Sequence, residues 1–73
     1  MLDRIVVDAQ ICHGKPVVKG TRTPVSVVFG AIVAGDSFEQ IAADYSIERN
    51  DVRACVTFAL NEINASSFRS LAI

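Results

Sequence analysis

The 73-residue sequence is poor in the residues that build metal sites and disulfide frameworks. It contains no tryptophan, one histidine and two cysteines. Cys12 and Cys55 are too few and too far apart for metal-ligand spacing, and His13 adds only one further ligand. We expect both thiols to be reduced and to pack as small apolar groups. The sequence therefore predicts no metal and no cofactor.

A secretory leader and a membrane helix are also missing. The charged pair Asp3 and Arg4 leads directly into a strand-like segment, unlike the apolar region of a signal peptide. No stretch approaches the ~18 uncharged apolar residues of a membrane helix. These features predict a cytoplasmic protein with no membrane partner.

The chain offers little that resembles a catalytic site. Cys12 and His13 are neighbours on an expected loop, but a nucleophilic cysteine needs a base that is oriented by a third group in a pocket. Paired carboxylates at a spacing that suits a cleft are absent as well. We therefore expect that the protein is not an enzyme.

A strong basic excess is lacking, since the net charge is −1, and this argues against strong non-specific binding of nucleic acid. The charge is unevenly distributed, however. Residues 1–22 hold four basic and two acidic residues, whereas residues 23–73 hold three basic and six acidic ones. Any contact with an anion should involve the front third and the start of the last helix.

Apolar residues are abundant: they make up 51% of the chain, and the mean hydropathy is +0.37. A domain of this length builds a core that contributes only ~3–5 kcal/mol unaided. The chain offers more apolar surface than such a domain can easily bury. We therefore expect a homo-oligomer, most simply a homodimer.

The front of the chain reads as a strand and turn region over residues 4–22. β-Branched residues in 4–8 and 16–18 predict two short strands, with glycines at Gly14 and Gly20 in the turns. The strands could pair within one chain or across a dimer.

Three helices are expected over residues 23–64. The first spans 24–34, with Thr23 as N-cap and Gly35 just past its end. It is apolar on all sides, so we expect the other helices to bury one side and the strands or a second subunit to bury the other. The second begins with a Ser37–Gln40 capping box, and the third covers 49–64. Residues 65–73 form a tail that could dock on a partner or stay loose.

The second and third helices predict a helix-turn-helix. In this motif the N-terminal residues of the second helix face the bases in the major groove of DNA. Arg49, Asn50, Arg53 and Thr57 lie there, and arginine and asparagine can bind guanine and adenine edges. The alternative is a solvated face with Arg53 paired to Asp51 or Glu62.

Further basic residues of the front third are candidate phosphate ligands. Lys15, Lys19 and Arg22 could hold the DNA backbone; alternatively, Arg22 locks the turn before the first helix and the lysines are simply exposed. Candidate residues of the dimer or partner interface are apolar and lie in the strands and the first helix: Ile5, Val7, Val17, Val28, Phe29 and Ile32.

One motif resembles a known family. The run Ile-Cys-His-Gly-Lys-Pro-Val-Val-Lys-Gly-Thr-Arg-Thr-Pro-Val, residues 11–25, is similar to the signature of the domain-of-unknown-function 433 family. The likeness continues through residues 35–41 and 51–59, and Glu48 stands where the pattern would place a threonine cap.

The resemblance implies a small helix-turn-helix protein, homeodomain-like or winged-helix-like, that is commonly dimeric. Members are often treated as antitoxins encoded beside a ribonuclease-like, PIN-type toxin. We thus expect a mainly α, single-domain chain over residues 1–73, with a strand pair followed by three helices. The expected function is that of a dimeric DNA-binding antitoxin; the alternative is a module that blocks a toxin without contacting DNA.

Overall fold

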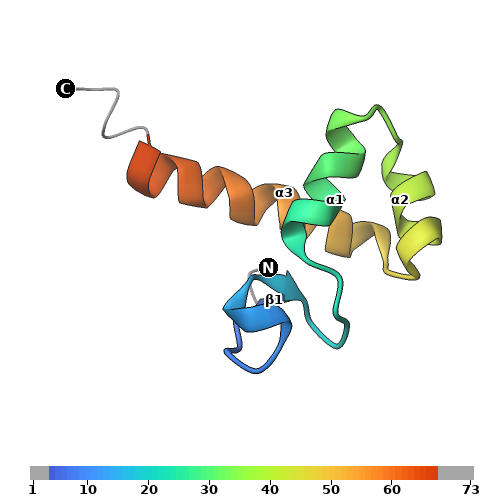
Figure 1. Ribbon diagram of the computed structural model, residues 1–73. Helices are drawn as coiled ribbons and strands as arrows, with labels where there is room; N and C mark the ends of the chain where they lie inside the picture. The colour runs from blue at the N-terminus through green and yellow to red at the C-terminus, as the bar shows by residue number, and fades with distance from the viewer. Residues whose placement is uncertain (1–3, 68–73) are drawn as a thin grey trace.

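The computed structural model describes residues 4–67; the predicted tail lies mostly outside them. The elements in chain order are β1 (Ile5–Val6), η2 (Cys12–Gly14), β2 (Val17–Val18), α1 (Val25–Val33), α2 (Phe38–Tyr45), α3 (Arg49–Glu62) and η3 (Ile63–Ser67), as Figure 1 shows. The prediction of a mainly α chain with a strand pair followed by three helices is confirmed.

The two strands pair with each other within the chain. They are antiparallel, with Ile5 opposite Val18 and Val6 opposite Val17. The pair is anchored to α1, because the Val25 amide donates to the Pro16 carbonyl at 2.9 Å. The strand pair thus holds the start of the first helix in place.

The start of α1 differs from its prediction. Pro24 occupies the N-cap position in an extended conformation, and Thr23 is not the cap. The backbone of Thr23 is bound elsewhere: its carbonyl accepts from the Val18 amide at 2.9 Å, and its amide donates to the Thr21 hydroxyl at 3.0 Å. These bonds keep Thr23 in the turn, and the helix begins two residues later.

The end of α1 agrees with its prediction. Gly35 has a φ of +100°, a left-handed conformation that costs glycine little. The Gly35 amide donates to the Ile32 carbonyl and the Asp36 amide to the Ala31 carbonyl, which satisfies two carbonyls at the helix end.

The core lies where the three helices meet the strand pair. Its buried members come from every helix and both strands: Ile5, Val18, Val25, Val28, Ile41, Val52, Ala54 and Cys55. Within the single chain α1 is not buried on all sides, because Val33 is 80% exposed and Val27 40%. One face of α1 packs on α2 and α3, and the described residues place no element over the other.

The last helix extends beyond the core. Its buried residues, Val52, Ala54 and Cys55, all lie in the first half. The predicted inward stripe continues to Leu60 and Ile63, but these are 55% and 48% exposed. The second half of α3 projects from the body in Figure 1, and η3 continues it with one π-helical turn. None of the helices in residues 4–67 has the length and apolar character to span a membrane.

Candidate nucleic-acid interface

The α2–turn–α3 unit is built by short-range signals. Ser37 caps α2 by accepting the Gln40 amide at 3.1 Å, while the Gln40 side chain donates to Asp44 at 2.8 Å instead of completing a capping box. Ser46 takes a left-handed conformation with φ 56°, and the half-buried Ile47 packs against the core. The turn therefore fixes where α3 begins, as predicted.

Three of the predicted DNA contacts come together at the start of α3. The exposed residues Arg49, Asn50 and Arg53 line one hollow of about 300 Å³, which Phe38 closes from α2. We call it the α3 hollow. It lies across the helix from the buried Cys55. The two guanidinium groups and the side-chain amide on this surface suit an anionic or base-edge acceptor.

Thr57, the fourth predicted contact on α3, lies one turn further along. It is half-buried, and its hydroxyl donates to the Arg53 carbonyl at 3.1 Å. Its hydrogen-bonding capacity is thus partly used within the helix. The structure does not bring it into the α3 hollow.

The two arginines of the hollow differ in their partners. The Nε atom of Arg49 lies 3.4 Å from a carboxylate oxygen of Glu39, but both side chains are about two-thirds exposed (67% and 66%), so the pair is weak. Within residues 4–67 no ion pair joins Arg53 to an acidic side chain. The alternative in which Arg53 pairs with Asp51 is wrong, because Asp51 binds Arg4.

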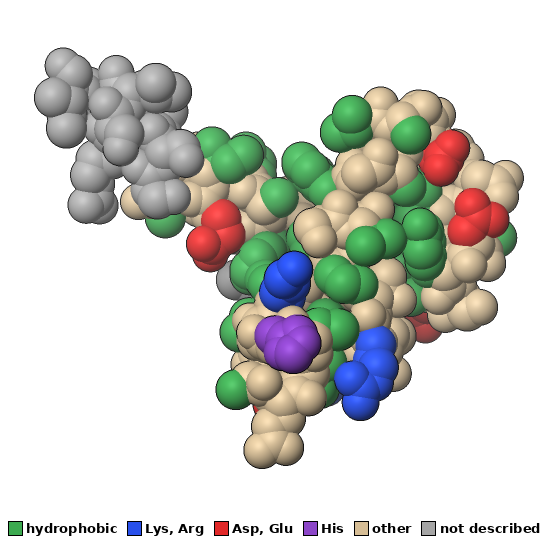
Figure 2. All heavy atoms as spheres, viewed as in Figure 1, with side chains coloured by type: hydrophobic (Ala, Val, Ile, Leu, Met, Phe, Trp, Pro, Cys, Tyr) green, Lys and Arg blue, Asp and Glu red, His purple; other side chains and the backbone are tan. Residues whose placement is uncertain are grey.

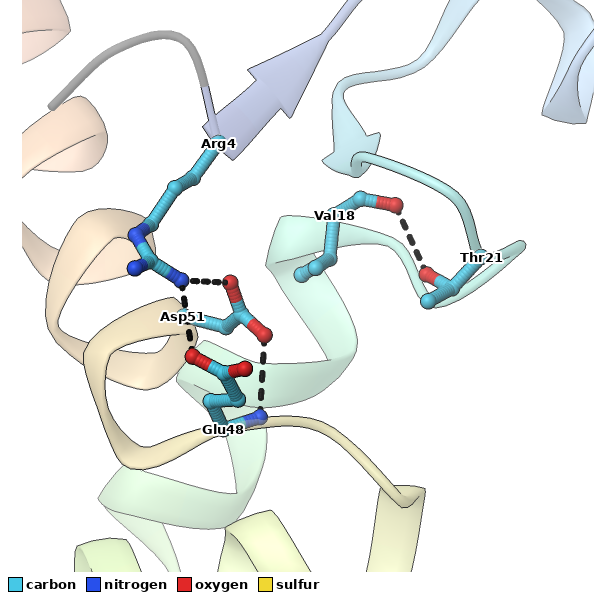
Figure 3. A network of polar contacts seen from close by, with 5 residues as sticks. All are labelled: Arg4, Val18, Thr21, Glu48 and Asp51. Atoms are coloured by element: carbon cyan, nitrogen blue, oxygen red, sulfur yellow. Dashed lines mark hydrogen bonds and ion pairs between the residues drawn. The ribbon is translucent and has the colours of Figure 1, made fainter.

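The bond between Arg4 and Asp51 belongs to a cluster that the sequence did not predict. In Figure 3 the guanidinium of Arg4 points at both carboxylates: its Nη1 atom lies 2.9 Å from Asp51 and 3.2 Å from Glu48. Asp51 also accepts the amide of the N-cap residue Glu48 at 2.9 Å, which is one half of the capping box that the two residues form at the start of α3. The hydrogen bond that Arg4 donates to Asp51, followed by the one that it donates to Glu48, raises the pKa of Arg4.

This cluster alters the electrostatics of the helix start. Carboxylates at the N-terminus of α3 repel phosphate, and Glu48 and Asp51 would do so if they were unpaired. Arg4 offsets part of that negative charge. Because Arg4 and Asp51 are 47 positions apart in the chain, local sequence signals could not reveal the pair.

The three predicted phosphate ligands of the front third lie in different places. Lys19 lines a hollow with Arg4, Glu48 and Asp51, close to the start of α3. Lys15 lies beside the second half of α3, where it lines a groove with Phe58. Arg22 is exposed and lines none of these surfaces.

The turn between β2 and α1 is locked by Thr21, not by the side chain of Arg22. The Thr21 hydroxyl donates to the Val18 carbonyl at 2.7 Å, and Figure 3 shows this bond across the turn. The only part of Arg22 in a hydrogen bond within the described residues is its carbonyl, which accepts from Cys12 Sγ at 3.5 Å. The Arg22 side chain is therefore available to solvent or an anion.

Several candidate interface residues belong to the core of the single chain. Ile5 is 8% exposed, and Val17 and Val28 are fully buried, so a partner does not reach them in this conformation. Their assignment to an interface is corrected for this reason. Val7 is 62% exposed, while Phe29 and Ile32 are half-buried.

The two cysteines have different environments. Cys55 is buried, and desolvation, aided by the nearby charge of Asp51, raises the pKa of its thiol to about 11. Cys12 is half-buried in the η2 turn. Among residues 4–67 no three His, Cys, Asp or Glu side chains come together as metal ligands.

Comparison with known proteins identifies a family and a structural relative. The X-ray structure of Rv2018 from Mycobacterium tuberculosis matches with a TM-score of 0.66 and 31% sequence identity, over 71% of this chain and 24% of that one. The chain thus spans about a quarter of the length of that relative. No curated protein sequence matches significantly. The family model described as "Protein of unknown function (DUF433)" matches residues 5–59, so the chain belongs to this family, as its signature predicted.

Proposed function

We propose that the protein is a dimeric helix-turn-helix DNA-binding protein that acts as the antitoxin and transcriptional autoregulator of a toxin–antitoxin pair. The observation that carries the DNA-binding part is the α3 hollow, which gathers Arg49, Asn50 and Arg53 at the start of the second helix of the motif. The antitoxin part rests on the family likeness. Binding to a groove of DNA needs such groups to be exposed and rigidly placed on one helix.

The local charge balance supports this proposal. Arg53 has no acidic partner in residues 4–67, and Arg4 offsets the charge of Glu48 and Asp51. Lys19 adds a cation on the other side of the helix start. Since the whole chain has a charge of −1, we expect a single chain to bind DNA weakly, and binding to weaken as the salt concentration rises.

The direct test is fluorescence anisotropy with fragments of the DNA upstream of the protein's own gene, at low and at physiological salt. We expect Arg53→Ala to weaken binding of the specific fragment about 10- to 100-fold, as the loss of a bidentate base contact does. Arg53→Lys keeps the positive charge but loses the paired guanidinium donors that bind a base bidentately. It therefore distinguishes a specific contact with a base from a simple contact with a phosphate.

Arg22→Ala is the comparison variant, because Arg22 is exposed and lies outside the α3 hollow. Loss of a phosphate contact at Arg22 would weaken the binding of all fragments alike, whereas Arg53→Ala should weaken the specific fragment most. If no upstream fragment binds at low salt, or if the two alanine variants weaken binding equally, the α3 hollow is not a DNA-reading surface.

A second function is favoured by the outer face of α1. This face is exposed and uncharged, and consists of Ser26, Val27, Gly30, Val33 and Ala34. Such a surface suits a protein partner, here a ribonuclease-like toxin that is bound and blocked without any DNA contact. Co-purification with the product of the neighbouring gene tests this: Val33→Asp should abolish the complex and Arg53→Ala should leave it intact.

A further inference from the structure

An apolar groove runs between the start of α1, the loop before β2 and the second half of α3. Its volume is about 410 Å³, and its lining includes Pro16, Val25, Phe29, Phe58, Ala59 and Ile63. Figure 2 shows hydrophobic side chains gathered where α3 leaves α1. The groove lies on a different part of the molecule from the α3 hollow, and no described segment fills it.

The wall of this groove is also the part of α3 that projects. Beyond Cys55 the helix buries no residue, and Leu60 and Ile63 are 55% and 48% exposed. We call residues 56–63 the α3 arm. A short helical segment in water gains little stability by itself and normally depends on packing of its apolar side. The arm therefore presents an apolar ridge directly beside an apolar groove.

We propose that a second copy of the chain occupies the groove, with the α3 arm of each copy lying antiparallel in the groove of the other. A ridge and a groove on one face are self-complementary, which is the condition for a closed two-fold interface. The charged lining residues are Lys15 and Glu62, one of each sign, and the rest of the named lining is apolar. This inference rests on the dimeric part of the proposed function and specifies its interface.

The length of α3 supports a second copy over other occupants. Twelve residues separate Arg49 from Asn61, which corresponds to about 18 Å of helix. In an antiparallel pairing centred near Asn61, the two helix starts lie about 36 Å apart, close to the ~34 Å that separates successive turns of DNA. The pairing places an α3 hollow at each end of the dimer and covers neither.

The test begins with sedimentation equilibrium of the full chain without DNA, over a range of concentrations. We expect a dimer, and Ile63→Asp should weaken its association at least about thirtyfold, as the loss of a central interface side chain does. Val33→Asp is the matched control: Val33 is 80% exposed on the outer face of α1 and should leave association unchanged. Circular dichroism verifies that both variants remain helical.

A cross-link locates the arm in the partner's groove. In a Cys12→Ser background, chains with Phe29→Cys are mixed with chains with Ile63→Cys and mildly oxidised. We expect a disulfide between the two kinds of chain, and little or none when Val33→Cys replaces Ile63→Cys. This readout does not depend on how strongly any variant weakens the dimer.

Three outcomes would overturn the inference. The first is a chain that stays monomeric at every concentration. The second is a dimer that Ile63→Asp does not weaken and in which Phe29→Cys and Ile63→Cys form no disulfide. The third is a monomer whose Phe29→Cys thiol becomes reactive only when residues 68–73 are deleted. The last would assign the groove to the chain's own end. The interface and the DNA-binding function can fail separately. If Arg53→Ala abolishes DNA binding and leaves the dimer intact, the dimer does not depend on the DNA-binding surface. If a monomer binds DNA, the DNA-binding function does not depend on this interface.

Discussion

At the scale of a single side chain, Asp51 joins the residue before the first strand to the start of the last α-helix. One carboxylate oxygen accepts from Arg4 at the start of β1, and the other accepts the Glu48 amide as one half of the capping box of α3. Its side chain is only 15% exposed, whereas that of Glu48 is 74% exposed. Of the two carboxylates, Asp51 should therefore matter more for stability.

Replacing Asp51 with alanine removes one half of the capping box and the bond to Arg4, and it leaves the Glu48 amide without its acceptor. We expect the free energy of unfolding, measured by urea denaturation, to fall by about 1–2 kcal/mol. Asp51→Asn keeps an acceptor and should lose less. Asp44→Ala serves as control, because Asp44 is exposed and should change stability by about 0.5 kcal/mol or less. Equal losses at Asp51 and Asp44 would contradict the role of the cluster.

Cys55 should make stability decline at alkaline pH. Its thiol has a pKa of about 11 in the folded chain, against an ordinary value near 9. Between these values the unfolded chain releases the proton and the folded chain keeps it, so rising pH favours unfolding. The contribution is fully present below about pH 8.5 and declines as the pH rises towards 11.

The measurement is the difference in unfolding free energy between the wild type and Cys55→Ala across this pH range. Lysine and tyrosine titrate in both proteins, so the difference isolates the thiol. We expect it to shrink by an amount of the order of 1–3 kcal/mol. A constant difference from pH 7 to 11 would show that the thiol ionises as readily in the folded chain as in the unfolded one.

At the scale of elements, two glycines of α1 should respond in opposite ways to the same change. Gly30 lies inside the helix, and a Cβ atom added there would have no neighbouring heavy atom within 4 Å. Gly30→Ala should therefore stabilise the protein by up to ~1 kcal/mol. Gly35 ends the helix at φ +100°, so Gly35→Ala should destabilise it by ~1 kcal/mol. Thermal or urea unfolding of the pair provides the test, and changes of the same sign would exclude this account of the helix end.

Elements that depend on neighbouring residues were predictable from the sequence. The Ser37 cap, the Gly35 terminus and the start of α3 each involve groups within a few positions of one another. Thr23 was misassigned because its backbone bonds to Val18 and Thr21, and that competition depends on the position of β2. Apolar composition predicted that α1 must be covered, but it could not say that the strand pair leaves its outer face exposed in the single chain.

The candidate site was predictable to a similar extent. Arg49, Asn50 and Arg53 follow from helical spacing, and they do share one hollow. The Arg4 cluster and the separate locations of Lys15, Lys19 and Arg22 follow only from tertiary packing. The apolar groove likewise combines residues of the front loop, α1 and α3, which no local pattern connects.

At the scale of the whole molecule, the proposed dimer couples stability to concentration. An interface formed only by folded chains stabilises them by mass action. We expect the melting temperature of the wild type to rise as its concentration is increased, and that of Ile63→Asp to stay constant. Scanning calorimetry at several concentrations measures this, with Val33→Asp expected to behave like the wild type. A wild-type melting temperature that does not change with concentration would argue against the interface.

The bond from Arg4 to Asp51 also affects how the protein is completed during synthesis. It joins residues 47 positions apart, so the first strand is made long before its partner on the last helix exists. Chains emerge from the ribosome N-terminus first, and a growing chain that stops before residue 51 has neither the cap of α3 nor the α3 hollow. The surface proposed to read DNA therefore forms late, when the residue before the first strand meets the start of the last α-helix.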